Sequence, residues 1–391
     1  MSRLFKKNTM VVSAVISAAL LLSACSDGDT SSSSREPVYN EVRYSAPDNT
    51  QGSAFSENKE AAPTTDPISR PESSSAGASV PSPVGSTEIG SFTPVGGIRN
   101  IARGNSFEED ANFGHFCAVD NGYYYVDLND GFLYFTDSDG NTSSVLNDYV
   151  RALNYYDGYL YYIKGTKSEF LAKEHFYAGS IWRLDPVSGA EICLIDVPEN
   201  MSFSVNEYGI IAHPDGGGLA LYDLDGKETE RLSNENQSVC IIGNKLCLRN
   251  DGKTVLRDLD TGEESDFPEN MLMAACVGDK LVCADMNDQW SKMILNLSTG
   301  EARRLPQSSA FVFAVCNGEL YAADNDNLYR VDLENARYES VISYQQGSPV
   351  YFFALHSDGE RLYALMRNQL NESRLAEVDI ERGELKYPED Q

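Results

Sequence analysis

The stretch Asn317-Gly318-Glu319-Leu320-Tyr321, followed by Asp332-Leu333-Glu334-Asn335, contains the two turn signatures that decide the fold of this chain. In the first signature, a tight Asn/Asp/Gly turn precedes a strand of alternating apolar residues. Gly and Asn supply the positive φ that a short hairpin turn requires. This signature occurs seven times, at Asp120-Asn121-Gly122-Tyr123, Asp157-Gly158-Tyr159-Leu160-Tyr161, Tyr208-Gly209-Ile210, Gly243-Asn244-Lys245-Leu246, Gly278-Asp279-Lys280-Leu281, Asn317-Gly318-Glu319-Leu320-Tyr321 and Asp358-Gly359-Glu360-Arg361-Leu362-Tyr363.

The second signature is a strand that ends in an acidic or amide residue and then turns. It alternates with the first and also occurs seven times, at Asp137-Ser138-Asp139-Gly140, Asp185-Pro186-Val187-Ser188-Gly189, Asp223-Leu224-Asp225-Gly226, Asp258-Leu259-Asp260-Thr261-Gly262, Asn296-Leu297-Ser298-Thr299-Gly300, Asp332-Leu333-Glu334-Asn335 and Asp379-Ile380-Glu381-Arg382-Gly383. Two hairpins per unit give four strands per unit. Residues 96–391 divide into seven units of about 42 residues, which is the length of a four-stranded propeller blade. The sequence therefore predicts an all-β fold, a seven-bladed β-propeller of four-stranded antiparallel blades.

Two segments are candidates for completing the last blade. One is Glu384–Tyr387, which follows the last turn, and the other is Gly97–Ala102, which precedes the first unit. The units lack the Gly-His and Trp-Asp signature of WD40 blades and contain many tyrosines instead. In this they resemble the Tyr-rich propeller domains of unknown function in surface lipoproteins of Gram-positive anaerobes. The resemblance covers roughly residues 100–387 and implies no catalytic residues.

The N-terminus has the features of an export signal. Lys6 and Lys7 precede an apolar run from Met10 to Leu22, which is too short to span a bilayer, since a spanning helix needs about 20 residues. The run ends in Leu22-Ser23-Ala24-Cys25, which resembles the bacterial lipoprotein box. That resemblance implies a signal peptide over residues 1–24 and acylation of Cys25, with palmitate as one of the chains. We therefore expect a lipid-anchored protein on the extracytoplasmic face of a bacterial cell membrane.

Residues 25–95 begin with the lipidated Cys and continue as a segment rich in Ser and Pro with few large aliphatic residues. Such a composition cannot bury enough apolar surface to offset its ordering entropy, so we expect a disordered linker before the propeller at residues 96–391. The formal net charge of the chain is −28. An excess of negative charge repels phosphate, which argues against a nucleic-acid partner.

One connection is longer than its counterparts and differs from them in composition. It joins the second and third strands of the second unit, from Lys164 to Gly179, and interleaves cations with aromatic residues. This composition suits an anionic or carbohydrate-like ligand or a partner protein. An ordinary loop whose aromatic side chains pack onto its own blade can have the same composition. The candidate ligand-binding residues are Lys164, Lys167, Phe170, Lys173, His175, Phe176 and Tyr177.

The cysteines give a weaker signal. If the turn is at Gly243-Asn244, Cys240 and Cys247 lie directly opposite each other, so a cross-strand disulfide is reachable in an exported protein. Small buried hydrophobic positions are the alternative for these cysteines. Clusters such as Asp137-Ser138-Asp139-Gly140-Asn141 resemble the opening of a calcium loop, but Asp and Asn are equally the normal residues of tight turns. We expect no metal and no cofactor.

The sequence thus favours a non-enzymatic module that binds a protein or a glycan at the cell envelope. The enzyme alternative is a glycan-degrading hydrolase or lyase with acidic and Tyr residues in the propeller channel. A third possibility is an envelope-assembly scaffold. Two carboxylates about 5–10 Å apart in an open pocket of the channel would favour the hydrolase, whereas a plugged apolar channel would favour binding.

Overall fold

The structure is a computed structural model that describes residues 94–95, 98–111, 114–166, 179–200, 202–235, 237, 239–250, 253–268, 271–344 and 348–387. The proposed signal peptide, Cys25 and the linker up to residue 93 lie outside these ranges. So does most of the candidate loop, from Lys167 to Tyr177. No helix in the described ranges is both long enough and apolar enough to cross a bilayer.

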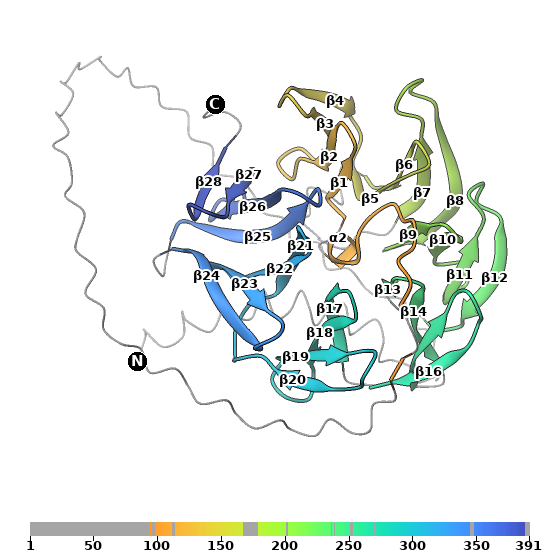
Figure 1. Ribbon diagram of the computed structural model, residues 1–391. Coiled ribbons are helices and arrows are strands. Elements are labelled where there is room, and N and C mark those ends of the chain that lie inside the picture. The colour runs from red at the N-terminus through yellow and green to blue at the C-terminus, as the bar shows by residue number, and fades with distance from the viewer. Residues whose placement is uncertain are drawn as a thin grey trace, which may run out of the picture. The chain divides into compact units, whose positions relative to one another are not determined.

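Seven four-stranded antiparallel sheets form a ring (Figure 1). Each sheet uses four strands that are consecutive in the chain, here called blades 1 to 7. Blade 1 contains β1 (Phe116–Val119), β2 (Gly122–Val126), β3 (Leu133–Asp137) and β4 (Thr142–Leu146); blade 2 contains β5 (Val150–Tyr156), β6 (Tyr159–Lys164), β7 (Gly179–Leu184) and β8 (Glu191–Asn200); blade 3 contains β9 (Ser204–Asn206), β10 (Gly209–Ala212), β11 (Leu219–Tyr222) and β12 (Glu228–Ser233); blade 4 contains β13 (Ile241–Ile242), β14 (Lys245–Asn250), β15 (Lys253–Asp258) and β16 (Glu264–Phe267). Blade 5 contains β17 (Met271–Val277), β18 (Lys280–Asp285), β19 (Ser291–Asn296) and β20 (Ala302–Arg304); blade 6 contains β21 (Val312–Cys316), β22 (Glu319–Ala323), β23 (Asn327–Asp332) and β24 (Arg337–Ser343); blade 7 contains β25 (Val350–Ser357), β26 (Leu362–Asn368), β27 (Ser373–Asp379) and β28 (Glu384–Lys386). The predicted seven-bladed β-propeller is confirmed.

The first turn signature forms the hairpin between the first two strands of a blade. In blade 6, Cys316 pairs with Glu319, so Asn317 and Gly318 are the two loop residues. Their φ angles are 51° and 75°, the left-handed values that a type I′ turn needs at both positions. The Asn-Gly spacing therefore fixes the register of this hairpin locally.

The second signature also forms its turn through local hydrogen bonds, and the pattern is the same in every blade. The side-chain oxygen of the residue at the end of the third strand, or directly after it, accepts backbone N–H groups from the turn that follows. In blade 6, Asp332 Oδ1 accepts from the amides of Glu334 and Asn335, and Asn296 does the same in blade 5. The equivalent acceptors in the other blades are Asp137, Asp185, Asp223, Asp258 and Asp379. The acidic residues that recur along the chain are therefore turn residues.

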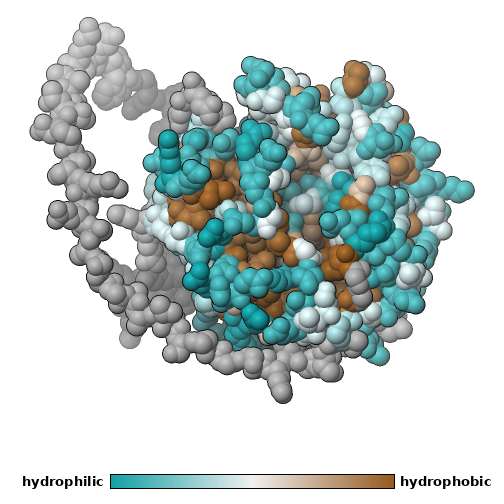
Figure 2. Space-filling model, in the orientation of Figure 1, coloured by the Kyte–Doolittle hydropathy of each residue, from teal (hydrophilic) through white to brown (hydrophobic). Residues whose placement is uncertain are grey.

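The core is divided among the interfaces between blades. Alternate residues of each strand point to the two neighbouring blades, so each interface has its own apolar cluster. Among the described residues the smallest cluster lies between blades 7 and 1, where Phe116, Tyr123 and Tyr363 are the buried members. Hydrophilic residues occupy much of the rim in the view of Figure 2, and larger hydrophobic areas lie inward of it.

The last blade is completed by its own fourth strand, since β28 pairs with β27 through Val378 and Leu385. Of the two predicted candidates, the segment at Glu384–Tyr387 therefore forms this strand. The segment that begins at Ile98 crosses the turns of blades 3 and 4 instead. Among the described residues no strand is exchanged between blades 7 and 1, where the ring closes, and we call this interface the seam.

The turn acceptors predict a specific dependence of stability on pH. Hydrogen bonds from Asn335, with Arg337 beside them, lower the pKa of Asp332 to about 2. Its contribution to stability is present above the unfolded-state pKa of about 3.9 and is lost as the pH falls through the folded value. We expect Asp332→Ala to lower Tm at pH 7 by roughly 2–4 °C, with the difference from the native protein vanishing near pH 2.

Asp332→Asn is the matched control, because Asn296 already serves as the acceptor in blade 5. It should retain most of the stability in thermal unfolding followed by circular dichroism. Equal losses for the Ala and Asn variants would contradict a hydrogen-bonding role.

Candidate functional site

The segment before blade 1 runs over one face of the ring and then enters its centre (Figure 1). We call residues 98–102 the strap and residues 103–111 the plug. The strap lies on the turns of blades 3 and 4, where the amide of Arg99 donates to Asn244 Oδ1 and its carbonyl accepts from the Asn244 amide. The Arg99 guanidinium contacts Glu207 at 2.6 Å and Asp260 at 2.8 Å. The strap is thereby fastened to two adjacent blades.

The plug ends in the short helix α2 (Phe107–Ala111). Ser106 caps this helix, because its Oγ accepts from the amide of Glu109. This Ser-x-x-Glu spacing is the capping box of a helix N-terminus. It is the signal by which sequence analysis could have found this helix, although not its position in the centre of the ring, and the helix was not predicted.

The first half of the plug binds backbone groups of four inner strands. The amide of Gly104 donates to the carbonyl of Val205 at 2.7 Å, and its carbonyl accepts from the amide of Tyr155. Asn105 Nδ2 donates to the carbonyls of Phe116 and Leu153. Arg103 donates to the carbonyl of Ile241.

The second half carries three consecutive acids into the protein, and each has a specific partner. Glu108 accepts from the amide of Cys276 at 2.8 Å. Glu109 Oε2 lies 2.6 Å from His356 Nδ1, and its Oε1 accepts from the amide of Ser357.

Asp110 lies 3.1 Å from Arg103. Burial raises the pKa of Asp110 to about 7, against the opposing effect of Arg103. Burial also raises the pKa of Glu108 above its ordinary range. The acids near the axis therefore hold the plug in place, and burial makes two of them easier to protonate than ordinary carboxylic acids.

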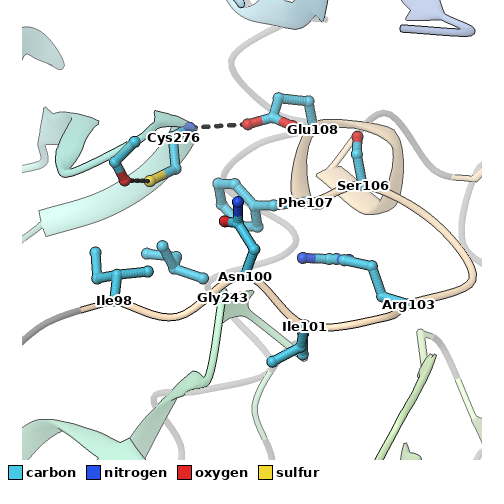
Figure 3. Close-up of a pocket in the computed structure, with 11 residues that line it drawn as sticks. Ile98, Asn100, Ile101, Arg103, Ser106, Phe107, Glu108, Gly243 and Cys276 are labelled. Carbon is cyan, nitrogen blue, oxygen red and sulfur yellow. Dashed lines mark hydrogen bonds between the residues drawn. The ribbon is translucent and has the colours of Figure 1, made fainter.

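A pocket of about 280 Å³ lies beside the plug (Figure 3). Ile98, Ile101 and Phe107 give it an apolar wall, and Glu108 and Cys276 lie across from each other, joined by their hydrogen bond. Burial, with Glu108 nearby, raises the pKa of the Cys276 thiol to about 12. A thiol with this pKa is almost entirely protonated at neutral pH and is a poor nucleophile. The pocket therefore offers no thiolate nucleophile.

The predicted site residues fall into two groups. Lys164 ends β6 and contacts Asp148 at 2.6 Å and Glu191 at 2.8 Å. Its ammonium also lies 4.6 Å from the centre of the Trp182 ring, so Lys164 is engaged with its own blade and with the connection from β4 to β5. The other candidates, Lys167, Phe170, Lys173, His175, Phe176 and Tyr177, lie outside the described residues.

The two cysteines proposed as a pair are opposite each other, as the turn predicts. The amide of Cys247 donates to the carbonyl of Cys240 at 2.9 Å. Both are free thiols in this structure, and Cys240 Sγ lies 3.3 Å from Met273 Sδ. In the described ranges, no group of three or more His, Cys, Asp or Glu residues is placed to hold a metal ion.

No family model and no curated protein matches the sequence. Solved structures with a similar fold include puromycin hydrolase, at 14% identity and a TM-score of 0.52, covering 76% of this chain and 56% of that one. An acylaminoacyl peptidase of Pyrococcus horikoshii has 12% identity and a TM-score of 0.47 over 70% of this chain and 49% of its own. The propeller domain of the Trilobed protease from Pyrococcus furiosus has 10% identity and a TM-score of 0.48 over 76% of this chain and 97% of its own. The chain thus spans about half the length of the first two, and the likeness to puromycin hydrolase shows the fold alone.

The hydrogen bonds of the plug predict that removing the buried Glu109 side chain strongly destabilises the fold. Glu109→Ala leaves the His356 ring and the Ser357 amide without their acceptor, and we expect the free energy of unfolding to fall by roughly 2–5 kcal/mol. Glu109→Gln, which keeps an oxygen acceptor, should lose less. Urea unfolding measures the difference.

Glu381→Ala is the control, because Glu381 is exposed in a turn of blade 7. A loss at Glu109→Ala no larger than at Glu381→Ala would contradict the role of the plug.

Proposed function

We propose that this protein is a lipid-anchored, extracytoplasmic β-propeller that binds a protein or a glycan at the cell envelope. The observation that carries the proposal is the plug. The centre of the ring, where a propeller enzyme of the alternative kind would hold its substrate, is occupied by residues 103–111 of the chain itself. Ligands would then bind on the faces of the ring.

The state of the buried acids supports the same reading. A glycosidase needs one carboxylic acid and one carboxylate with access to the glycosidic bond. Glu108 and Glu109 are each 4% exposed, and both are hydrogen-bonded to groups of the inner strands. Their arrangement serves the attachment of the plug and offers no free pair for proton transfer.

The loop from Lys164 to Gly179 is the binding region that we propose. Its described ends, Lys164 of β6 and Gly179 of β7, lie on the face opposite the strap, because the first and second strands of a blade turn back on the strap side. Lys164 would anchor the base of this loop through Asp148 and Glu191. Lys167, Phe170, Lys173, His175, Phe176 and Tyr177 would supply the contacts with the ligand.

The proposed acylation of Cys25 predicts the fraction in which the protein is found after cell lysis. Acylation of Cys25 would add several buried CH₂ groups at about 0.8 kcal/mol each, so the native protein should sediment with membranes and incorporate labelled palmitate. Cys25→Ser should be soluble after cell lysis and unlabelled. Labelling of Cys25→Ser at the native level would contradict the lipoprotein assignment.

The binding role is tested by photo-cross-linking on intact cells, with the full-length protein in its membrane. We expect Lys167→Ser/Lys173→Ser to reduce the yield of the specific adduct at least tenfold, because the two ammonium groups are removed. The control Lys227→Ser/Lys253→Ser changes two exposed lysines on other blades and should leave the yield unchanged.

Release of reducing ends from envelope glycans by the purified protein, abolished by Glu108→Gln, would overturn the binding role in favour of the hydrolase. An adduct of unchanged yield in the Lys167→Ser/Lys173→Ser variant would exclude this loop.

A further inference from the structure

The inner strand of blade 4 is the shortest inner strand in the described ranges. β13 contains only Ile241 and Ile242, and it pairs with β14 at these two positions, whereas the other inner strands have three to eight residues. This strand nevertheless holds the plug, because the carbonyl of Ile241 accepts from Arg103. The turn after it holds the strap through the hydrogen bonds between Asn244 and Arg99. A cross-link at β13 would therefore secure the attachment of both segments.

Two cysteines stand where such a cross-link could form. Cys240 directly precedes β13, and Cys247 lies within β14. The amide of Cys247 donates to the carbonyl of Cys240 at 2.9 Å, which continues the register of the hairpin by one position. The Cα atoms of a directly opposite, hydrogen-bonded pair lie about 5.5 Å apart, and disulfides span Cα distances of about 4.4–6.8 Å. The pair therefore meets the distance requirement for a disulfide.

The two sulfur atoms also lie on the same side of the hairpin. Both cysteines pack against the apolar cluster between blades 4 and 5, which includes Leu281 and Met273. Cys240 Sγ contacts Met273 Sδ at 3.3 Å. A hydrogen bond with the Cys247 thiol, together with burial, raises the pKa of Cys240. The two thiols are thus neighbours within one apolar interface.

The next candidate pair is less well placed. Cys276 is opposite Leu281 and Cys283 is opposite Met273, which makes these two cysteines diagonal neighbours. The Cα atoms of diagonal neighbours are about 7–8 Å apart, beyond the usual reach of a disulfide. The remaining cysteines of the described ranges lie on other blades and are Cys117, Cys193 and Cys316. The register therefore favours Cys240 with Cys247.

We propose that Cys240 and Cys247 form a cross-strand disulfide in the exported protein, and that this bond secures the inner strand of blade 4 under the strap and the plug. The oxidant is an organic disulfide. One cysteine thiolate attacks it, forms a mixed disulfide and expels the first donor thiolate. The second cysteine thiolate then attacks the protein sulfur of the mixed disulfide and expels the second donor thiolate.

The exchange is balanced, because the two cysteines lose two protons and two electrons and the donor disulfide gains them as two thiols. The oxidising location of the protein rests on the proposed function, since disulfides persist outside the cytosol. The pairing itself depends only on the hairpin, and it requires neither the loop at Lys164 nor acylation of Cys25.

The test uses the purified full chain, treated with oxidised glutathione or with dithiothreitol, then alkylated and digested with trypsin. Trypsin cleaves after Lys245, so the disulfide would join peptide 232–245 to peptide 246–249. We expect mass spectrometry to find this linked pair after oxidation and to lose it after reduction. The oxidised protein should have a Tm roughly 3–6 °C above that of the reduced protein, because the closed loop constrains the unfolded chain. Protein from cells that are alkylated before lysis should contain the same linked pair.

Cys240→Ala/Cys247→Ala should lose the linked pair and the redox dependence of Tm. Cys276→Ala/Cys283→Ala is the matched control and should keep both. Three results would overturn the proposal. They are no linked pair in the oxidised native protein or in the protein from cells, a linkage through Cys276 or Cys283 in its place, and an undiminished Tm difference in Cys240→Ala/Cys247→Ala.

The linked peptides are detected in the native protein, so the proposal stays testable even if the double variant does not fold. Absence of palmitate from the native protein would contradict the anchor at Cys25 and would leave the peptide pair with glutathione unchanged. The failure of the disulfide and the failure of the proposed function are therefore distinguishable.

Discussion

The inner strand of each blade hydrogen-bonds to one neighbouring strand only, so its other edge presents backbone N–H and C=O groups to the axis of the ring. Such groups must find partners, because an unpaired buried backbone group costs free energy comparable to a lost hydrogen bond. The plug supplies these partners. Within the described residues it bonds to six of the seven inner strands. The groups that it satisfies are the carbonyls of Phe116, Leu153, Val205 and Ile241 and the amides of Tyr155, Cys276 and Ser357.

This requirement explains why polar and acidic residues are buried at the centre of an otherwise apolar architecture. Amides of inner strands need acceptors, and Glu108 and Glu109 bring carboxylate oxygens to them. The cost is the burial of three adjacent acids, which is offset in part by the ion pair between Arg103 and Asp110. An acidic cluster near the axis of a propeller can thus be structural.

The propeller could be predicted from the sequence because its hairpins are determined locally. Asn317-Gly318 has the positive φ angles that a tight turn needs, and the turn at Gly243-Asn244 correctly placed Cys240 opposite Cys247. The plug could not be predicted in this way. Its contacts join residues that are far apart in the chain, such as Glu109 and His356, which are separated by 247 positions. No local periodicity records such a pairing, so the candidate site emerged only from the structure.

The plug also accounts for how the ring closes. In the described residues no strand is shared between blades 7 and 1, and the seam has the smallest apolar cluster. Hydrogen bonds across the seam therefore matter more to its stability. The Asn129–Ser373 pair is one tie across the seam. The plug is another, because Asn105 binds blade 1 and Glu109 binds blade 7. The plug thus links blades 1 and 7 as an exchanged strand would, because the two blades cannot separate without breaking its hydrogen bonds. The strap continues from this segment toward the N-terminus, so the chain that would lead to a membrane anchor is the same chain that closes the ring.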